Sequence, residues 1–146
     1  MDKIYANNKK AYFDYEIIDS VEAGIVLIGQ EVKATRNNRM NLNGSYATFH
    51  NGELFLINSS IAKYQPKNQV ADYIEDRSRK LLLSKKQLEK MFVLTKEKRV
   101  TLIPLKAYPK NGKIKILLGV GKGKKNYDKR ESLKQKDQKR HLKEWI

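Results

Sequence analysis

The stretch VTLIPLKAYPKNGKIKILLGV, residues 100–120, predicts a β-rich fold. Two apolar runs, residues 100–108 and 113–120, flank a turn with the sequence Pro-Lys-Asn-Gly. Because an Asn-Gly pair supplies the positive φ angles that a tight hairpin requires, we expect two antiparallel strands here. Pro104 has no N–H to donate to a strand ladder, so it is expected at a sheet edge or a bulge.

More strands are predicted upstream of this hairpin. The segment YATFHNGELFLI, residues 46–57, holds a second Asn-Gly turn at Asn51 and Gly52. Residues 12–18 alternate between apolar and polar, and residues 24–28 form a continuous apolar run, so each is expected to be a strand. The chain is therefore predicted to have about six short strands, most of them joined by hairpins.

Two helices are expected among these strands. Residues 30–36 contain good helix formers and lack the period of two that is typical of a strand. Residues 84–98 begin with Ser84 and Gln87 at the spacing of a capping box. Residues 64–80 are polar with weak periodicity and are predicted to be a long exposed loop. The apolar residues at helical spacing in the second helix are Leu88, Met91, Phe92 and Thr95.

Composition indicates a polyanionic partner. The chain has 146 residues, enough for one domain, with 31 Lys and Arg against 16 Asp and Glu and a formal net charge of +15. No stretch approaches the length of a spanning helix and MDKIYANNKK lacks the apolar core of a signal peptide, so we expect a cytoplasmic protein with no membrane partner. The absence of cysteine fits a reducing compartment and excludes thiolate chemistry.

Catalytic patterns are missing from the sequence. His50 and His141 have no carboxylates at metal-ligand spacing and are expected to be surface imidazoles. GVGKGKK, residues 119–125, follows a strand as a phosphate-binding loop does, but no Ser or Thr follows its lysine and no apolar helix comes next. We therefore expect a binding protein rather than an enzyme, with no metal and no cofactor.

Residues 121–146 are predicted to be a basic tail attached to a barrel of residues 1–120. If residues 128–146 were helical, five cations would fall within an arc of roughly 100°. Leu133 and Leu142 lie on opposite sides of such a helix, so no apolar stripe would dock it, and we expect the tail to be disordered when free and helical on RNA. The five cations are Lys129, Lys136, Lys139, Arg140 and Lys143.

Residues at both ends of the tail bear on the hypothesis that the tail binds RNA. Gly119, Gly121 and Gly123 are expected to interrupt strand pairing and to let the tail swivel. A solvated tail without a role is the alternative, since most charge runs are solvated. The final Trp145-Ile146 is an unusual end for such a tail and favours RNA binding.

Six segments of the chain resemble, in order and spacing, the small protein B family, which binds transfer-messenger RNA (SsrA) in bacterial ribosome rescue. They are NKKAYFDYEI, EAGIVLIGQEVKATR, NLNGSYATFHNGELFLIN, RKLLLSKKQL, LIPLKAY and GKGKKNYDKRE. This resemblance covers nearly the whole chain. It implies a monomeric, OB-like antiparallel β-barrel with two or three flanking helices that grips the tRNA-like domain of transfer-messenger RNA. It also implies that the tail enters the messenger channel of a stalled ribosome, at the small-subunit rRNA near the decoding centre, so that the nascent peptide is tagged for degradation.

The resemblance extends to individual residues. Motif matching implies that Asn8, Glu22, Leu82 and Lys115 contact transfer-messenger RNA. For Glu22 a turn-facing surface charge is the alternative, and for Leu82 ordinary core. Lys115 lies between two isoleucines that should point inward, so its side chain should point outward. The predicted ribosome contacts of the tail are Lys122, Lys124, Lys125, Tyr127, Asp128, Lys129, Arg130, Lys136, Lys139, Arg140, Lys143 and Trp145.

Two positions depart from the family pattern. Gln30 stands where many relatives carry Thr or Trp, and Tyr127 stands where many carry His. Tyrosine can still stack on a base, so that role is retained. The alternative function, from a different class, is a structural ribosomal or ribosome-assembly protein bound to rRNA, which charge alone does not distinguish.

Overall fold

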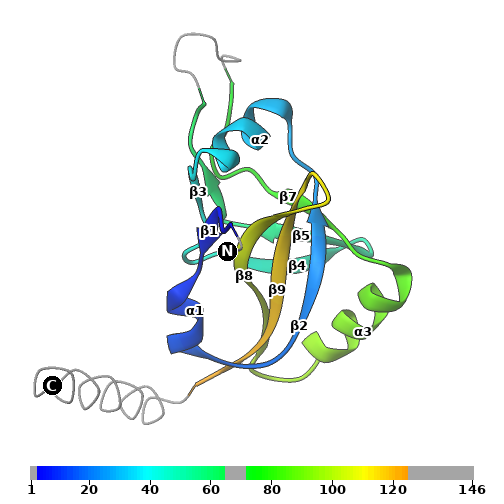
Figure 1. Ribbon diagram of the computed structural model, residues 1–146. Helices are drawn as coiled ribbons and strands as arrows, with labels where there is room; N and C mark the ends of the chain where they lie inside the picture. Colours follow the sequence, from blue (N-terminus) through cyan, green and yellow to red (C-terminus); the bar gives the residue numbers. More distant parts are fainter. Residues whose placement is uncertain (1–2, 65–71, 125–146) are drawn as a thin grey trace, which may run out of the picture.

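The computed structural model describes residues 3–64 and 72–124 and is rich in β-structure with three helices (Figure 1). The helices are α1 (Lys9–Asp14), α2 (Gly29–Arg36) and α3 (Lys85–Thr95). The strands are β1 (Ala6–Asn7), β2 (Tyr15–Ile25), β3 (Met40–Asn41), β4 (Tyr46–His50), β5 (Glu53–Ile57), β6 (Ser60–Ile61), β7 (Arg79–Leu82), β8 (Val100–Lys110) and β9 (Lys113–Gly123).

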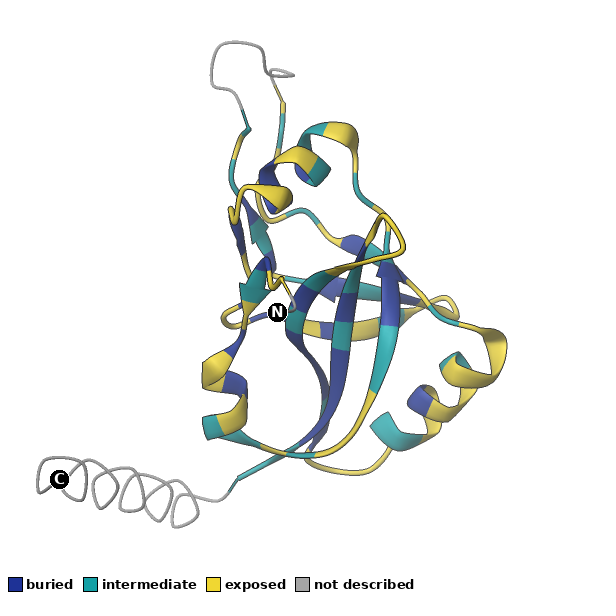
Figure 2. Cartoon of the chain, viewed as in Figure 1, coloured by how far each residue is buried: buried dark blue, intermediate teal, exposed yellow. Residues whose placement is uncertain are grey.

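Six of these strands close into a ring. The main sheet has the order β1-β8-β4-β5-β7-β2-β9, and β9 pairs in addition with β8, so that β8, β4, β5, β7, β2 and β9 form a closed circuit. Helix α2 lies at one end of the ring, while α1 and α3 lie toward the other (Figure 1). Buried residues follow the ring strands (Figure 2). The fully buried side chains of the core include Leu54, Leu56, Leu102, Ile116 and Leu118.

Both predicted hairpins are confirmed. β4 pairs with β5 and β8 pairs with β9, with Asn-Gly at each turn. The φ angles are 50° and 78° at Asn51 and Gly52, and 52° and 74° at Asn111 and Gly112, which is the left-handed backbone that such two-residue turns require. The register of the second hairpin shifts between Pro104 and Lys106, so the predicted bulge is also present.

The two strands predicted at residues 12–18 and 24–28 are wrong in their bounds. Residues 9–14 form helix α1, and β2 then runs without a break from Tyr15 to Ile25. The alternation of apolar and polar residues wrongly predicted a strand here, because tertiary packing determines that these residues form a short helix. Ala11 is buried beside Ile103 and Leu105 of β8. A helix of six residues has little stability of its own, so tertiary contacts decide its formation.

Helices α2 and α3 match their predictions closely. The predicted capping box of α3 is confirmed, because Gln87 N–H donates to Ser84 Oγ at 3.2 Å and Ser84 N–H donates to Gln87 Oε1 at 3.1 Å. Met91 is buried, whereas Phe92 keeps 45% of its surface exposed and contacts the Phe49 ring edge-on, with centroids 5.3 Å apart. The apolar stripe of α3 is therefore only partly covered by the closed ring of strands.

Part of the segment predicted as an exposed loop, residues 64–80, is instead buried structure. Arg79 and Lys80 begin strand β7, and the Arg79 side chain is fully buried against Glu31 of α2. Arg79 Nη2 lies 2.7 Å from Glu31 Oε2, and Arg79 Nη1 donates to the Ser59 carbonyl at 2.9 Å. Arg77 also pairs with Glu31. The predicted loop thus contains an ion cluster that ties β7 to α2.

The charge of Glu31 is maintained by this cluster. Burial acts to raise the pKa of the Glu31 carboxyl, but hydrogen bonds from Arg77, the Ile28 N–H and Arg79 outweigh burial and hold that pKa below its ordinary value. Glu31 is therefore ionised at neutral pH although it is fully buried.

The expectation that Gly119, Gly121 and Gly123 interrupt pairing is wrong. β9 pairs with both β2 and β8 as far as Lys122, and with β2 as far as Gly123. A Cβ at Gly119 would lie 2.8 Å from Leu105 Cδ1, and one at Gly121 would lie 2.9 Å from Ile103 Cδ1. Glycine is needed at these two positions because neighbouring side chains fill the space. The strand ends three residues beyond the predicted boundary at residue 120, and the conformation predicted for the tail lies outside the described residues.

Substitution of Gly121 by valine should lower the free energy of unfolding by about 1–3 kcal/mol, the usual cost of overpacking. The new Cβ would meet Ile103 on one side and Tyr15 Cβ, at 3.1 Å, on the other. Chemical denaturation measures the loss. Gly123→Val is the matched control, because the nearest atom to its Cβ is 3.9 Å away, and it should change stability by less than about 0.5 kcal/mol. Equal losses in the two variants would contradict the packing role of Gly121.

Candidate nucleic-acid interface

The outward side chains of four neighbouring strands form one surface, which we call the lysine face. The strand registers place Gly24 of β2 opposite both Leu82 of β7 and Lys115 of β9, and Lys115 opposite Tyr108 of β8. Since paired residues project from the same side of a sheet, these four positions form one row across the ring. The lysine face consists of Glu22, Gly24, Leu82, Lys106, Tyr108, Lys110, Lys113, Lys115 and Leu117.

Lysines are the most frequent residues of the lysine face, and they lie at intervals across the sheet. Lys106 Nζ lies 5.3 Å from the centroid of the Tyr108 ring, in a cation–π contact. Lys115 Nζ lies 3.6 Å from the point that a Cβ on Gly24 would occupy, so the glycine gives this lysine room to extend across β2. Phosphate groups are the natural ligands of ammonium groups spread in this way over the outside of a sheet.

Glu22 is the acidic residue of the lysine face, and it organises its neighbours. The Tyr108 hydroxyl donates to Glu22 Oε1 at 2.6 Å, and Lys110 Nζ donates to Oε2 at 3.0 Å. The hydrogen bonds from Tyr108 and then Lys110 lower the pKa of Glu22, while burial and the Glu22 carboxylate raise the pKa of Tyr108. At neutral pH a charged Glu22 therefore accepts hydrogen bonds from a neutral Tyr108 and from Lys110.

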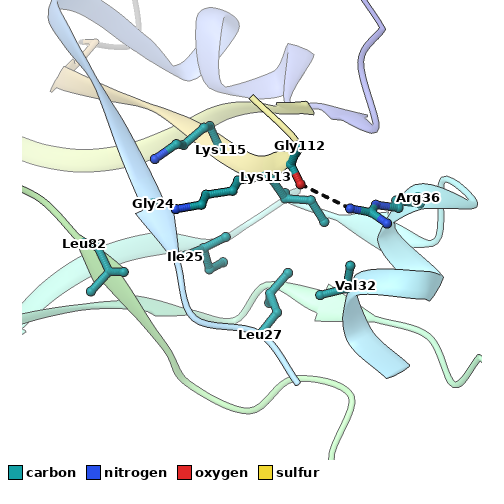
Figure 3. A pocket seen from close by; sticks show the side chains of 10 residues that line it. Gly24, Ile25, Leu27, Val32, Arg36, Leu82, Gly112, Lys113 and Lys115 are labelled. Atoms are coloured by element: carbon teal, nitrogen blue, oxygen red, sulfur yellow. Dashed lines mark hydrogen bonds between the residues drawn. The ribbon is translucent and has the colours of Figure 1, made fainter. Parts of the chain in front are cut away.

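A pocket of about 290 Å³ opens beside the lysine face, between β2, β9 and α2 (Figure 3). Arg36 of α2 crosses to the turn between β8 and β9, where its Nη2 donates to the Gly112 carbonyl at 3.3 Å. The pocket has apolar walls and a cationic rim. The residues that line it are Gly24, Ile25, Leu27, Val32, Arg36, Leu82, Gly112, Lys113, Ile114 and Lys115.

The structure brings together three of the four residues that the resemblance implied for the barrel. Glu22, Leu82 and Lys115 all belong to the lysine face. Leu82 is 49% exposed, so the alternative that it is ordinary core is wrong. The predicted outward orientation of Lys115 is confirmed, because Ile114 and Ile116 on either side are buried while Lys115 is partly exposed.

Asn8 lies apart from these three residues, inside the fold. It is 2% exposed, and its Nδ2 donates to the Pro104 carbonyl at 2.9 Å and to the Leu42 carbonyl at 3.2 Å. A buried amide that satisfies two carbonyls supports the bulge of β8 rather than a ligand. We therefore leave Asn8 out of the interface, in contrast to the role implied by the resemblance.

The sequence did not identify four polar residues of the lysine face, nor the arginine of the pocket beside it. They are Lys106, Tyr108 and Lys110 of β8, Lys113 of β9 and Arg36 of α2. The three residues of β8 could have been found, because alternation along the strand puts Lys106 and Tyr108 on the side opposite the buried Ala107. Arg36 gave no such signal, since its contact with the Gly112 carbonyl joins residues 76 positions apart.

Only two of the predicted tail residues fall within the described part of the chain. Lys122 is partly exposed near the end of β9, and Lys124 Nζ donates to the Tyr12 carbonyl at 3.3 Å. Both follow the strand away from Lys113 and Lys115, so they are not part of the lysine face. The other predicted tail residues, from Lys125 to Trp145, lie outside the described residues, as does His141.

The described residues hold no constellation typical of a metal centre. Across residues 3–64 and 72–124, no three His, Cys, Asp or Glu side chains come close enough together to hold a metal ion. His50 is exposed. Nor is any helix in this part of the chain both long and apolar enough to cross a membrane.

Known proteins resemble this chain along nearly its whole length. Residues 5–146 match the family model described as SmpB protein. The SsrA-binding protein of Bacillus subtilis (strain 168) is 51% identical over 142 residues, covering 96% of this chain and 89% of the relative. That of Enterococcus faecalis (strain ATCC 700802 / V583) is 50% identical over 140 residues, covering 96% and 90%.

A solved structure is also similar. It is described as "tmRNA-SmpB: a journey to the center of the bacterial ribosome", and one of its chains matches with a TM-score of 0.69 and 41% identity, over 87% of this chain and 92% of the other. The family model and the relatives each cover far more than half of the sequence. The chain therefore belongs to the SmpB protein family.

Proposed function

We propose that this protein binds the tRNA-like domain of transfer-messenger RNA through its lysine face and delivers that RNA to stalled ribosomes. The observation that carries the proposal is the row of Leu82, Gly24, Lys115 and Tyr108 across four strands, with further lysines beside it. Lysines can bind phosphates, while Tyr108 and Leu82 offer surfaces for exposed bases. The relatives support the proposal, because they are named SsrA-binding proteins.

The second half of the proposal concerns the ribosome. The similar solved chain comes from a structure described as tmRNA-SmpB in the bacterial ribosome, which supports the same assembly for this protein. We infer that the basic residues after Lys124 contact small-subunit rRNA near the decoding centre and become helical there, and that the nascent peptide is then tagged for degradation. This activity belongs to the cytoplasm, with the protein acting as a monomer and without catalysis of its own.

We also infer that the closed ring of strands is an OB-type barrel. Its support is the closure of β8, β4, β5, β7, β2 and β9 around one apolar core, with α1, α2 and α3 outside it. Barrels of this type commonly bind RNA on an exposed strand face, which agrees with the position of the lysine face.

Replacement of Lys115 by alanine should weaken binding to transfer-messenger RNA several-fold and reduce the slope of log K against log salt by about one, the effect of one lost phosphate contact. Lys115 is suited to this test because it points outward at the centre of the lysine face. Filter binding or fluorescence anisotropy at several salt concentrations measures both quantities.

The control is Lys86→Ala, at an exposed lysine of α3 outside the lysine face. It removes the same charge and should leave the affinity nearly unchanged. Equal affinities and slopes for the two variants would take Lys115 out of the interface. RNA recovered from cells with the protein separates the two functions: a rescue factor brings down chiefly transfer-messenger RNA, whereas a structural ribosomal protein brings down rRNA in stoichiometric amount.

A further inference from the structure

The pocket beside the lysine face combines apolar walls with a rim of cations. Ile25, Leu27 and Val32 are only partly buried and face this space (Figure 3). Three cationic side chains, Arg36, Lys113 and Lys115, stand around it, and none of the described residues that line it is acidic. An apolar hollow within a basic surface suits a ligand that has a flat apolar body and a negatively charged attachment.

The size of the pocket restricts that ligand further. Its volume of about 290 Å³ lies just below the roughly 300–1,000 Å³ that is typical of sites for drug-sized molecules. A single nucleobase is a ligand of suitable size and apolarity, provided that the base is unpaired and unstacked. Bases splayed out of single-stranded loops are what proteins recognise most often in RNA.

Arg36 supplies the group that would hold a base in this pocket. Its guanidinium is tethered to the Gly112 carbonyl, so part of its side-chain freedom is already lost before any ligand binds. A guanidinium plane can stack on a base, whereas an ammonium group cannot. Lys113 and Lys115 line the same pocket, and their ammonium groups can bind phosphates.

We propose that this pocket binds one unstacked base of the RNA that the lysine face contacts. The base lies between the apolar side chains of β2 and α2, with the Arg36 guanidinium against it and its flanking phosphates on Lys113 and Lys115. The occupant follows from the proposed function, because it belongs to the same bound RNA. The pocket adds a means of selecting unpaired nucleotides to a surface that otherwise binds phosphates.

Two variants test the pocket, each with the full-length chain. Val32→Phe places a ring in the pocket without changing charge, and Arg36→Lys keeps the charge but removes the planar guanidinium. Arg39→Lys, at an exposed arginine three residues away that does not line the pocket, is the matched control. Circular dichroism and the thermal midpoint establish whether each variant is folded. If Val32→Phe does not fold, Arg36→Lys still tests the pocket.

Two RNA probes are used. The first is the transcribed tRNA-like domain of transfer-messenger RNA, mapped by chemical probing of its unpaired bases. The second is a short single-stranded RNA with one 2-aminopurine, whose fluorescence reports on stacking. We expect the wild-type protein to protect one unpaired base of the transcript and to change the 2-aminopurine signal. Both variants should lose these effects and bind about tenfold more weakly, the scale of one lost base stack, while Arg39→Lys resembles wild type.

The outcomes distinguish a failure of the proposal for the pocket from a failure of the proposed function. If Lys115→Ala weakens binding of the transcript but Val32→Phe and Arg36→Lys match wild type with both probes, the pocket does not hold a base and the proposal fails while the proposed function stands. If the variants lose the 2-aminopurine signal but the wild type does not bind the transcript, the pocket is supported and the proposed function fails.

Discussion

Replacement of Arg79 by methionine should lower the free energy of unfolding by about 3 kcal/mol, the lower end of the range for breaking a buried ion pair by removing one partner. Arg79 and Glu31 are both fully buried, so the loss would leave a carboxylate inside the fold without its inner partner. Arg77, whose side chain is 31% exposed, still pairs with Glu31 and keeps the loss from being larger. Urea denaturation at neutral pH measures the change.

The stability lost in Arg79→Met should depend on pH in a defined direction. In the wild type the pKa of Glu31 is lowered, so its contribution to stability is present above the ordinary pKa of a glutamate and is lost as the pH falls through the lowered value. Without Arg79 that pKa should rise toward its ordinary value or above. The stability difference between the two proteins should therefore shrink as the pH is lowered.

Two further variants distinguish the buried charge from simple loss of packing. Arg77→Met removes a partly exposed partner of the same carboxylate and should cost less than Arg79→Met. The double variant Glu31→Gln, Arg79→Met should recover part of the loss, because no unpaired charge remains in the interior. Equal losses for Arg77→Met and Arg79→Met, with no recovery in the double variant, would contradict the role assigned to the unpaired buried charge.

This cluster also shows which features the sequence could not predict. The hairpins and the start of α3 were predictable because their signals are local: an Asn-Gly pair at each turn, and Ser84 with Gln87 three residues later. The Glu31 cluster joins residues 46 and 48 positions apart. Strand β7 was missed because its inward residue Arg79 is charged, which breaks the apolar alternation that identifies a half-buried strand.

The candidate site divides in a similar way. Glu22, Leu82 and Lys115 could be named only through the family resemblance, and it is the strand registers that explain why they share one face. Periodicity also supported Lys115, because the buried isoleucines beside it fix its direction. No pattern in the sequence distinguishes an asparagine that binds a ligand from one that caps buried carbonyls, and Asn8 does the latter in the structure.

A chain that ends at Lys124 should remain folded and bind transfer-messenger RNA, yet fail to rescue stalled ribosomes. It keeps all of β9 and the hydrogen bond from the Lys124 N–H to the Asp14 carbonyl, at 3.1 Å. It loses the five cations predicted to line one side of the tail, together with Tyr127 and Trp145, which we expect to contact ribosomal RNA. Tagging of nascent chains on a message without a stop codon, in reconstituted translation, measures rescue.

The end point of this truncation matters because β9 continues past Val120. A chain that ends at Val120 would lose the pairs that Gly121, Lys122 and Gly123 make with β2, as well as pairs with β8. Several backbone hydrogen bonds, each worth about 0.5–1.5 kcal/mol net, would be lost, so this chain should be less stable by about 2–4 kcal/mol. Its failure to rescue would then reflect unfolding as well as the missing tail.

Two variants isolate the contribution of the tail itself. One is the shortened chain that ends at Lys124, and the other is the full-length variant Asp128→Ala, Lys129→Ala, Arg130→Ala. Both should bind the RNA normally and tag no nascent chains, and full tagging by either would overturn the role assigned to residues 125–146.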